Sequence, residues 1–168
     1  MAHPGRPRNH DPIADDIRRN IDRNDTSGAI ALLQTTDVDI PDGEAATPFI
    51  HAAFMGNLEL LRWLRERGAD IDAQDRNGWS ALHFAIQENR FDIVQWLVEH
   101  GAAIEPQDSY GNTPLWRATF EAHGDYRIVD FLVANGADPG VKNGSGRSPL
   151  DMAETFGDRG LCDVLKKR

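Results

Sequence analysis

The chain has 168 residues, which is enough for one domain with a sizeable buried core. Its composition is 40% hydrophobic and 27% charged, so the bulk of the chain is neither fibrous nor disordered. The formal net charge of −9 at pH 7 argues against nucleic acids and anionic membranes as partners, because both repel a negatively charged protein.

The first elements in chain order are an arm and a pair of short helical patterns. Residues 1–12 hold three prolines and almost no large apolar side chain, which predicts a disordered arm. This arm carries Arg6, Arg8 and Asp11, so the rest of the chain has a net charge of −10. In residues 13–41, charged side chains interrupt the apolar positions of both helical patterns. This is expected of a unit that covers the end of a stack.

A pattern then recurs four times along the chain. Four tetrapeptides align at spacings of 33, 33 and 35 residues, and they begin at Thr47, Ser80, Thr113 and Ser148. Their Ser or Thr suits a helix N-cap, and the Pro that follows in three of them suits the first helical turn. An Asp or Asn five residues earlier favours a turn, and a Gly after the second helical pattern of three units suits a left-handed helix end. Each unit therefore predicts a turn followed by two helices.

This pattern resembles the ankyrin-repeat family, which has a 33-residue unit and a Thr-Pro-Leu-His signature. The resemblance covers roughly residues 42–168. It implies an all-α solenoid of stacked helix-turn-helix units with β-turn or hairpin-like connections. We expect one domain over residues 13–168, composed of a capping unit 13–41, repeats at about 42–74, 75–107 and 108–142, and a C-terminal cap 143–168.

Several residues depart from the family pattern. Ile50, Trp116 and Asp151 replace the signature His, and Ala45 replaces a turn Gly. Asn89 replaces the Gly between two helices, and Asn tolerates the left-handed backbone region better than most residues. These exchanges place local turn geometry in question and leave the predicted fold unchanged.

Comparison of the units with one another indicates which positions face solvent. A position that is aromatic in one unit and polar in the others is expected to be exposed, and exposed apolar side chains on one face are typical interface anchors. Scattered apolar residues are also normal on any protein surface, which is the alternative interpretation. We expect the partner-binding residues to be Glu44, Phe54, Met55, Arg76, Trp79, Glu88, Tyr110, Asn112, Phe120 and Glu121.

The sequence shows no pattern that indicates catalysis, a metal or a cofactor. The six histidines are not spaced as metal ligands, and no phosphate-binding glycine loop or paired catalytic carboxylates appear. The single cysteine, Cys162, excludes an intrachain disulfide and favours a reducing compartment. No stretch approaches the ~18 apolar residues that span a bilayer. We therefore expect a soluble cytoplasmic protein that is not an enzyme.

The resemblance implies binding of another protein through the concave face and the turn tips. We expect a monomer, since ankyrin stacks need no oligomerisation for stability. The negative charge favours an acidic inhibitor of a basic toxin or enzyme, and some single-domain ankyrin proteins of bacteria are immunity proteins beside a toxin gene. Two alternatives are a structural adaptor, which would need a second apolar patch on the convex side, and a small enzyme that uses the acidic groove.

Overall fold

The computed structural model describes residues 11–167 of the chain. In these residues ten helices follow one another, and there is no strand, only an isolated antiparallel bridge between Gln74 and Ser80. The helices are α1 (Pro12–Asp22), α2 (Thr26–Leu33), α3 (Pro48–Met55), α4 (Leu58–Glu66), α5 (Ala81–Gln87), α6 (Phe91–Glu99), α7 (Pro114–Glu121), α8 (Arg127–Ala134), α9 (Pro149–Phe156) and α10 (Arg159–Leu165). The predicted all-α architecture is confirmed.

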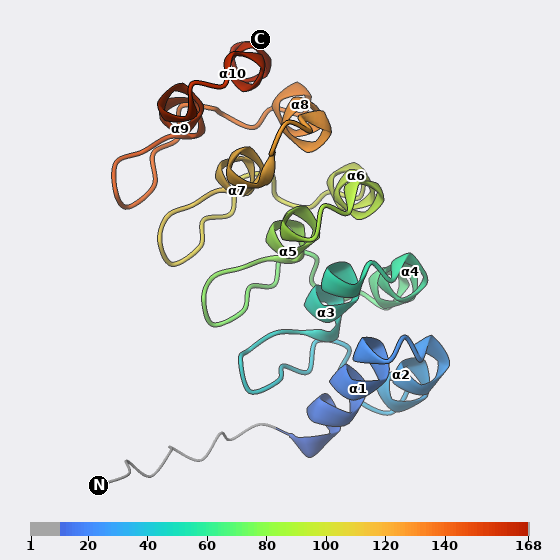
Figure 1. Ribbon diagram of the computed structural model, residues 1–168. Coiled ribbons are helices and arrows are strands. Elements are labelled where there is room, and N and C mark those ends of the chain that lie inside the picture. Colours follow the sequence, from blue (N-terminus) through green and yellow to red (C-terminus); the bar gives the residue numbers. More distant parts are fainter. Residues whose placement is uncertain (1–10, 168) are drawn as a thin grey trace, which may run out of the picture.

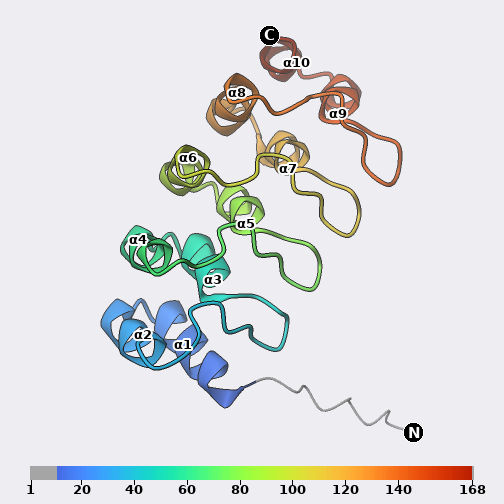
Figure 2. The same ribbon diagram turned by 180° about the vertical axis from the view of Figure 1, so that it is seen from behind.

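The helices form pairs that stack in one direction, as predicted for a solenoid (Figure 1). In each pair the odd-numbered helix lies beside the long turns and the even-numbered helix lies on the opposite side, which the view from behind also shows (Figure 2). Each odd-numbered helix contacts the next one along the stack. We call the face formed by the odd-numbered helices and the turns the inner face, and the face formed by the even-numbered helices the outer face.

The odd-numbered helices from α3 onward begin at the Ser and Thr residues that the repeat pattern predicts as caps. Three of their hydroxyl groups accept the backbone N–H three residues further on, at 3.1–3.4 Å (Thr47, Thr113 and Ser148). At α5 the His83 ring takes part instead: its Nδ1 accepts the Ser80 N–H at 3.2 Å, and its Nε2 lies 3.3 Å from the Asn112 carbonyl oxygen of the next unit. The signature histidine therefore supports a helix start and links two units.

The turns before these helices share one hydrogen-bonding pattern. In each turn an Asp or Asn side chain accepts the backbone N–H groups two and four residues further on, at 2.8–3.1 Å (Asp42, Asp75, Asp108 and Asn143). Neighbouring turns are also joined by backbone hydrogen bonds of 2.8 Å, from Arg76 to Glu44, Ser109 to Asn77, and Gly144 to Tyr110. The turns thus form one connected row along the edge of the stack (Figure 1).

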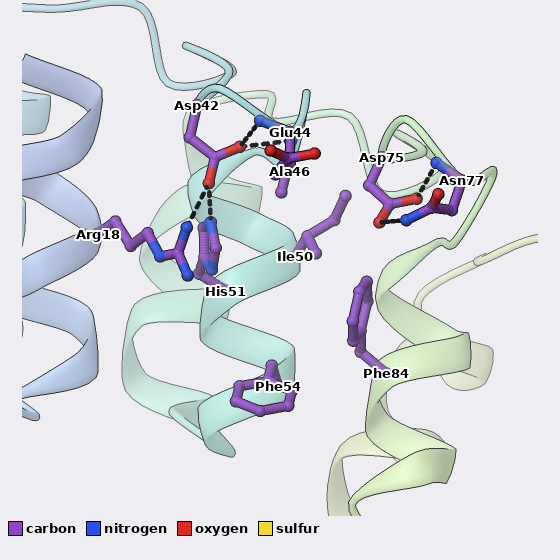
Figure 3. A pocket seen from close by; sticks show the side chains of 10 residues that line it. All are labelled: Arg18, Asp42, Glu44, Ala46, Ile50, His51, Phe54, Asp75, Asn77 and Phe84. Atoms are coloured by element: carbon purple, nitrogen blue, oxygen red, sulfur yellow. Dashed lines mark hydrogen bonds and ion pairs between the residues drawn. The ribbon is translucent and has the colours of Figure 1, made fainter. Parts of the chain in front are cut away.

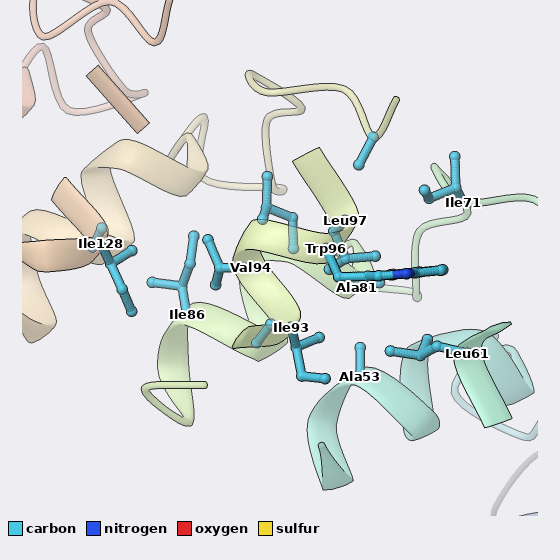
Figure 4. Close-up of a cluster of buried hydrophobic side chains, with 14 of the residues drawn as sticks. Ala53, Leu61, Ile71, Ala81, Ile86, Ile93, Val94, Trp96, Leu97 and Ile128 are labelled. Atoms are coloured by element: carbon cyan, nitrogen blue, oxygen red, sulfur yellow. The ribbon is translucent and has the colours of Figure 1, made fainter. Parts of the chain in front are cut away.

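The hydrophobic core runs between the two rows of helices. Even-numbered helices contribute fully buried leucine, isoleucine and valine side chains, such as Leu61 in α4 and Ile93 in α6. Odd-numbered helices contribute small residues, such as Ala53 and Ala81, which allow close helix packing (Figure 4). This core holds the odd-numbered helices in a fixed register, and side chains at equivalent positions of successive units therefore lie near one another on the inner face.

The described part of the chain begins just before α1. The Asp11 carboxylate accepts the Ile13 N–H at 3.1 Å, and Pro12 is the first helical residue, one residue before the predicted start of the capping unit. The rest of the predicted arm falls on residues 1–10, which lie outside the described residues.

Candidate protein-binding surface

Aromatic side chains from three units meet on the inner face. The ring centroids of Phe54 and Phe84 are 5.9 Å apart with an interplanar angle of 87°, and those of Phe84 and Trp79 are 5.0 Å apart. The Arg117 guanidinium carbon lies 4.4 Å from the Trp79 ring centroid. We call the connected group Phe54, Phe84, Trp79, Arg117, Trp116 and Phe120 the aromatic strip.

The strip continues along α7. The rings of Trp116 and Phe120 stack with a centroid distance of 5.8 Å and an interplanar angle of 8°, and the Arg117 guanidinium carbon lies 6.0 Å from the Phe120 centroid. Phe120 is 46% exposed, so this end of the strip is open to solvent. Cation–π contacts of this kind contribute about 0.5–2 kcal/mol each, depending on how far the cation is desolvated.

The repeat register explains why these side chains come together. Phe84 and Arg117 are the fourth residues after their helix caps, and Phe54 and Phe120 are the seventh. Positions three residues apart lie on one side of an α-helix, and the stacked units align these sides. Two repeat positions therefore supply Phe54, Phe84, Arg117 and Phe120, and Trp79 and Trp116 complete the contacts across the three units.

Two polar atoms of the strip have no hydrogen-bond partner. The Trp116 Nε1 and the Arg117 Nε are both buried, and neither meets an acceptor. The Arg117 Nη1 does lie 3.5 Å from the Glu121 carboxylate. Buried donors without acceptors are costly, so the strip combines apolar area with unsatisfied polar groups.

A hollow of about 620 Å³ extends the strip toward the turn tips. Trp116 forms part of its wall, and Tyr110, which is 72% exposed, forms another part. This part of the wall is completed by Gly111 and Gly144, one from each of the two adjoining turns. The largest exposed aromatic side chain of the turn row therefore adjoins the strip.

A second hollow, of about 220 Å³, lies between α3 and α5 near the opposite end of the strip (Figure 3). Its wall includes Phe54 and Phe84 of the strip and the Asp42 carboxylate. Asp42 accepts hydrogen bonds from Arg18 Nη1 at 3.1 Å and from His51 Nε2 at 3.0 Å. Burial alone would raise the pKa of the Asp42 carboxyl, but the bonds from His51 and from two backbone N–H groups hold that pKa well below its usual 3.8. The Asp42 carboxylate in the wall of the hollow therefore stays ionised, and it is paired with Arg18.

The structure places most of the predicted partner-binding residues at least partly in solvent. Arg76, Glu88, Tyr110 and Phe120 are exposed, and Glu44, Phe54, Met55, Trp79 and Glu121 are half-buried. Arg76 forms an ion pair with Glu44 at 3.2 Å. Met55 packs against the hydrophobic core. The strip brings together three of the predicted residues, Phe54, Trp79 and Phe120.

The predicted exposure of Asn112 is wrong, and Trp79 is less exposed than predicted. Asn112 is only 7% exposed, because its amide donates to Asp108 Oδ2 at 3.0 Å and accepts from Asn143 Nδ2 at 2.8 Å, which ties two turns together. Trp79 does not stand free at a turn tip. It is half-buried between Phe84 and Arg117.

Sequence comparison missed Phe84, Arg117 and Trp116. The fourth position after the helix cap holds His51, Phe84, Arg117 and Met152 in successive units. This mixed chemistry is the same signal that selected Phe54 and Phe120 at the seventh position, so the fourth position was open to the same inference. Trp116 stands at the signature-histidine position, where the family pattern favoured a structural role.

Neither a metal site nor a membrane span is found in residues 11–167. No group of three or more His, Cys, Asp or Glu side chains there is arranged to hold a metal ion. No helix in this part of the chain has the length and apolar character to cross a bilayer.

Comparison with known proteins gives one family. Residues 21–108 and 49–143 match the family model described as ankyrin repeats (3 copies). The chain is 35% identical over 142 residues to the B-cell lymphoma 3 protein homolog of Mus musculus, which covers 84% of this chain and 29% of that protein. It is 37% identical over 109 residues to the nuclear factor NF-kappa-B p105 subunit of Mus musculus, covering 63% of this chain and 11% of that protein.

A shorter similarity involves a smaller relative. The chain is 48% identical over 46 residues to the Notch-regulated ankyrin repeat-containing protein of Homo sapiens, covering 27% of this chain and 38% of that protein. The chain therefore spans well under half the length of each of these curated relatives.

Proposed function

Because the chain belongs to the ankyrin-repeat family, we propose that it is a non-catalytic module that binds a partner protein through its inner face and turn tips. The aromatic strip is the observation that carries this proposal. Interface hot spots are enriched in Trp, Tyr and Arg, and the strip with the adjoining Tyr110 supplies all three on a rigid scaffold. A preformed surface spares a complex part of the ordering entropy.

We further propose that the partner is basic and that the chain acts on it as an inhibitor, as an immunity protein acts on its toxin. The net charge of −9 supports this, since an acidic module attracts a basic partner at long range. Carboxylates at the 220 Å³ hollow add local negative charge on the inner face. The outer face offers less support for an adaptor role, because its second-helix positions Glu59, Arg62, Glu66, Asp92 and Asp130 are exposed and charged.

The proposal is tested by capture from an extract of the native cells. Wild-type chain is compared with a Tyr110→Ala, Phe120→Ala double variant, in which both changed side chains are exposed and the core is untouched. A Glu59→Ala, Arg62→Ala variant of the outer face is the matched control, and thermal melts verify that all three proteins are folded.

We expect one protein to be captured by the wild type and the outer-face control and to be lost by the double variant. Loss of two interface anchors of this type costs about 2 kcal/mol or more each, which corresponds to a large drop in affinity. Equal capture by all three proteins contradicts the proposal, and so does loss that occurs only in the outer-face control.

A further inference from the structure

The 220 Å³ hollow between α3 and α5 has the size of a site for one side chain. It is smaller than the ~300–1,000 Å³ of typical small-molecule sites. The turns that begin at Asp42 and Asp75 lie at one end, and the rings of Phe54 and Phe84 lie toward the other end (Figure 3). A guest that fits it needs a positive or hydrogen-bond-donating head and a part that packs on aromatic rings.

The charged end of the hollow is dominated by carboxylates. Asp42, Glu44 and Asp75 contribute three, and among residues 11–167 only Arg18 contributes a guanidinium to the wall. Arg18 forms an ion pair with Asp42 from within the protein, and the His51 ring hydrogen-bonds to the same carboxylate. A second cation is therefore attracted mainly by Glu44 and Asp75.

These two carboxylates are held in place. The Asp75 Oδ1 accepts the N–H groups of Asn77 and Trp79, both at 2.8 Å, which fixes its orientation. The Glu44 Oε2 pairs with Arg76 at 3.2 Å across an exposed surface. The Asp75 Oδ2 also lies 3.5 Å from the Asn77 side-chain amide nitrogen. A carboxylate has about four acceptor sites, so Asp75 can accept a further donor, and Glu44 adds negative charge beside it.

The next unit of the same protein shows what chemistry this surface accommodates. There Arg117 lies over the Trp79 ring at 4.4 Å, with the Phe120 ring at 6.0 Å and the Glu121 carboxylate at 3.5 Å. Phe120 occupies the same repeat position as Phe54. At the position equivalent to Arg117, the unit that contains Phe54 has His51, which is turned to Asp42. The inner face thus holds an arginine of its own between rings and a carboxylate where α5 meets α7. One step earlier in the stack, between α3 and α5, it has a hollow with rings and carboxylates.

We propose that the 220 Å³ hollow binds an arginine side chain of the partner protein. This inference rests on the proposed function, since the partner supplies the arginine. The planar guanidinium stacks on an aromatic ring and donates to carboxylates at the same time. Lysine fits less well, because its ammonium is a compact, strongly hydrated charge that offers no flat face.

The test uses a small probe with the complete chain. Nα-acetyl-L-arginine amide is titrated into isotope-labelled protein, and backbone amide resonances are followed by NMR. Nα-acetyl-L-citrulline amide has nearly the same shape without the charge, and Nα-acetyl-L-lysine amide has the charge without the planar head. We expect saturable shifts at Glu44, Phe54 and Phe84 with a dissociation constant in the millimolar range, several-fold weaker binding of the lysine probe, and no binding of citrulline.

Variants locate the site. Glu44→Gln should weaken arginine binding by about fivefold, because it removes one charge-assisted hydrogen bond near the surface. Glu66→Gln on the outer face should leave binding unchanged. Phe54→Ala should abolish saturation, whereas Phe120→Ala, which removes the same residue type at the same repeat position, should not. If the Phe54→Ala variant unfolds, the effect of Glu44→Gln on binding of the arginine probe decides whether the hollow is the site.

Failure of this inference is separable from failure of the proposed function. Absence of saturable shifts, equal binding of citrulline or lysine, or insensitivity to Glu44→Gln overturns the arginine site. If capture of the partner nevertheless depends on Tyr110 and Phe120, the proposed protein-binding function remains supported and only the arginine site is wrong. If the arginine probe binds as expected but capture of the partner does not depend on the inner face, the proposed function is contradicted instead.

Discussion

Single residues show where backbone strain and buried polar groups lie in the stack. Asn89 has a φ of 51° in place of a family glycine, as the tolerance of Asn for the left-handed region predicts. Ala45 has a φ of 63° at a turn where the equivalent residue of the three other units is glycine (Gly78, Gly111 and Gly146). Such a conformation is unfavourable for alanine, because its Cβ approaches the following carbonyl oxygen.

The strain at Ala45 predicts that Ala45→Gly stabilises the protein. Relief of the left-handed conformation is worth about 1–2 kcal/mol, and the greater flexibility of glycine in the unfolded chain removes about half of this. Urea denaturation should show a gain of roughly 0.5–1 kcal/mol. A loss of stability in Ala45→Gly, similar to that expected for Ala46→Gly at the neighbouring buried position, would contradict the assignment of strain.

The buried ring of His83 predicts a dependence of stability on pH. Burial lowers its pKa from 6.5 to about 4, although the bond to the Asn112 carbonyl acts in the opposite direction. The unfolded chain therefore takes up a proton below about pH 6.5, while the folded protein does so only near pH 4. Falling pH favours the unfolded state over this window, by roughly 3 kcal/mol at its lower end.

The measurement is urea denaturation of wild type and His83→Gln between pH 7 and about pH 4. Wild type should be the more stable at pH 7, because Ser80 keeps its acceptor, and its advantage should shrink as the pH falls. Parallel stability curves for the two proteins would show that His83 does not titrate in the buried state described here.

At the scale of the element, local chemistry could be predicted from sequence and contacts across units could not. The caps at Thr47 and Thr113 and the turn carboxylate of Asp75 depend on residues within a few positions, so their patterns are visible in the sequence. The burial of Asn112 depends on Asn143 in the next turn, and the position of Trp79 depends on Arg117 in the next helix. A comparison of equivalent positions identifies variable sites, but it does not show which of them touch each other.

The row of turns predicts an unusually strict need for glycine at one position. A Cβ on Gly111 would lie 2.8 Å from the Gly144 backbone nitrogen, and its φ is 76°. Gly146 has the same φ of 76°, but a Cβ there would meet no atom within 4 Å. The two residues therefore separate backbone strain from the contact between neighbouring turns.

We expect Gly146→Ala to cost about 1 kcal/mol from strain alone and Gly111→Ala to cost at least about 1 kcal/mol more. Denaturation of both variants measures the difference. Faster amide hydrogen exchange at Gly144, whose N–H bonds to Tyr110 across the two turns, should accompany the Gly111 change. Equal costs for the two variants would mean that the turns do not pack as closely as the structure shows.

At the scale of the whole molecule, charge and shape act together. The stack presents the aromatic strip and the turn row on one face, and the net charge of −9 surrounds them. Long-range attraction is screened beyond about 8 Å at physiological ionic strength and beyond about 30 Å at 0.01 M salt.

The proposed basic partner should therefore associate about tenfold or more faster at low salt, while its dissociation rate changes little. Stopped-flow mixing with the captured partner measures both rates, and a salt-independent association rate would contradict a basic partner.

Hydrogen exchange of the chain with and without the captured partner tests most directly whether the inner face is the binding surface. We expect protection of backbone amides at the inner face, in the turn around Tyr110 and in α3, α5 and α7. Amides of the outer face, in α4, α6 and α8, should exchange as in the free protein. Protection confined to the outer helices would contradict binding at the inner face and would place the partner on the opposite side of the stack.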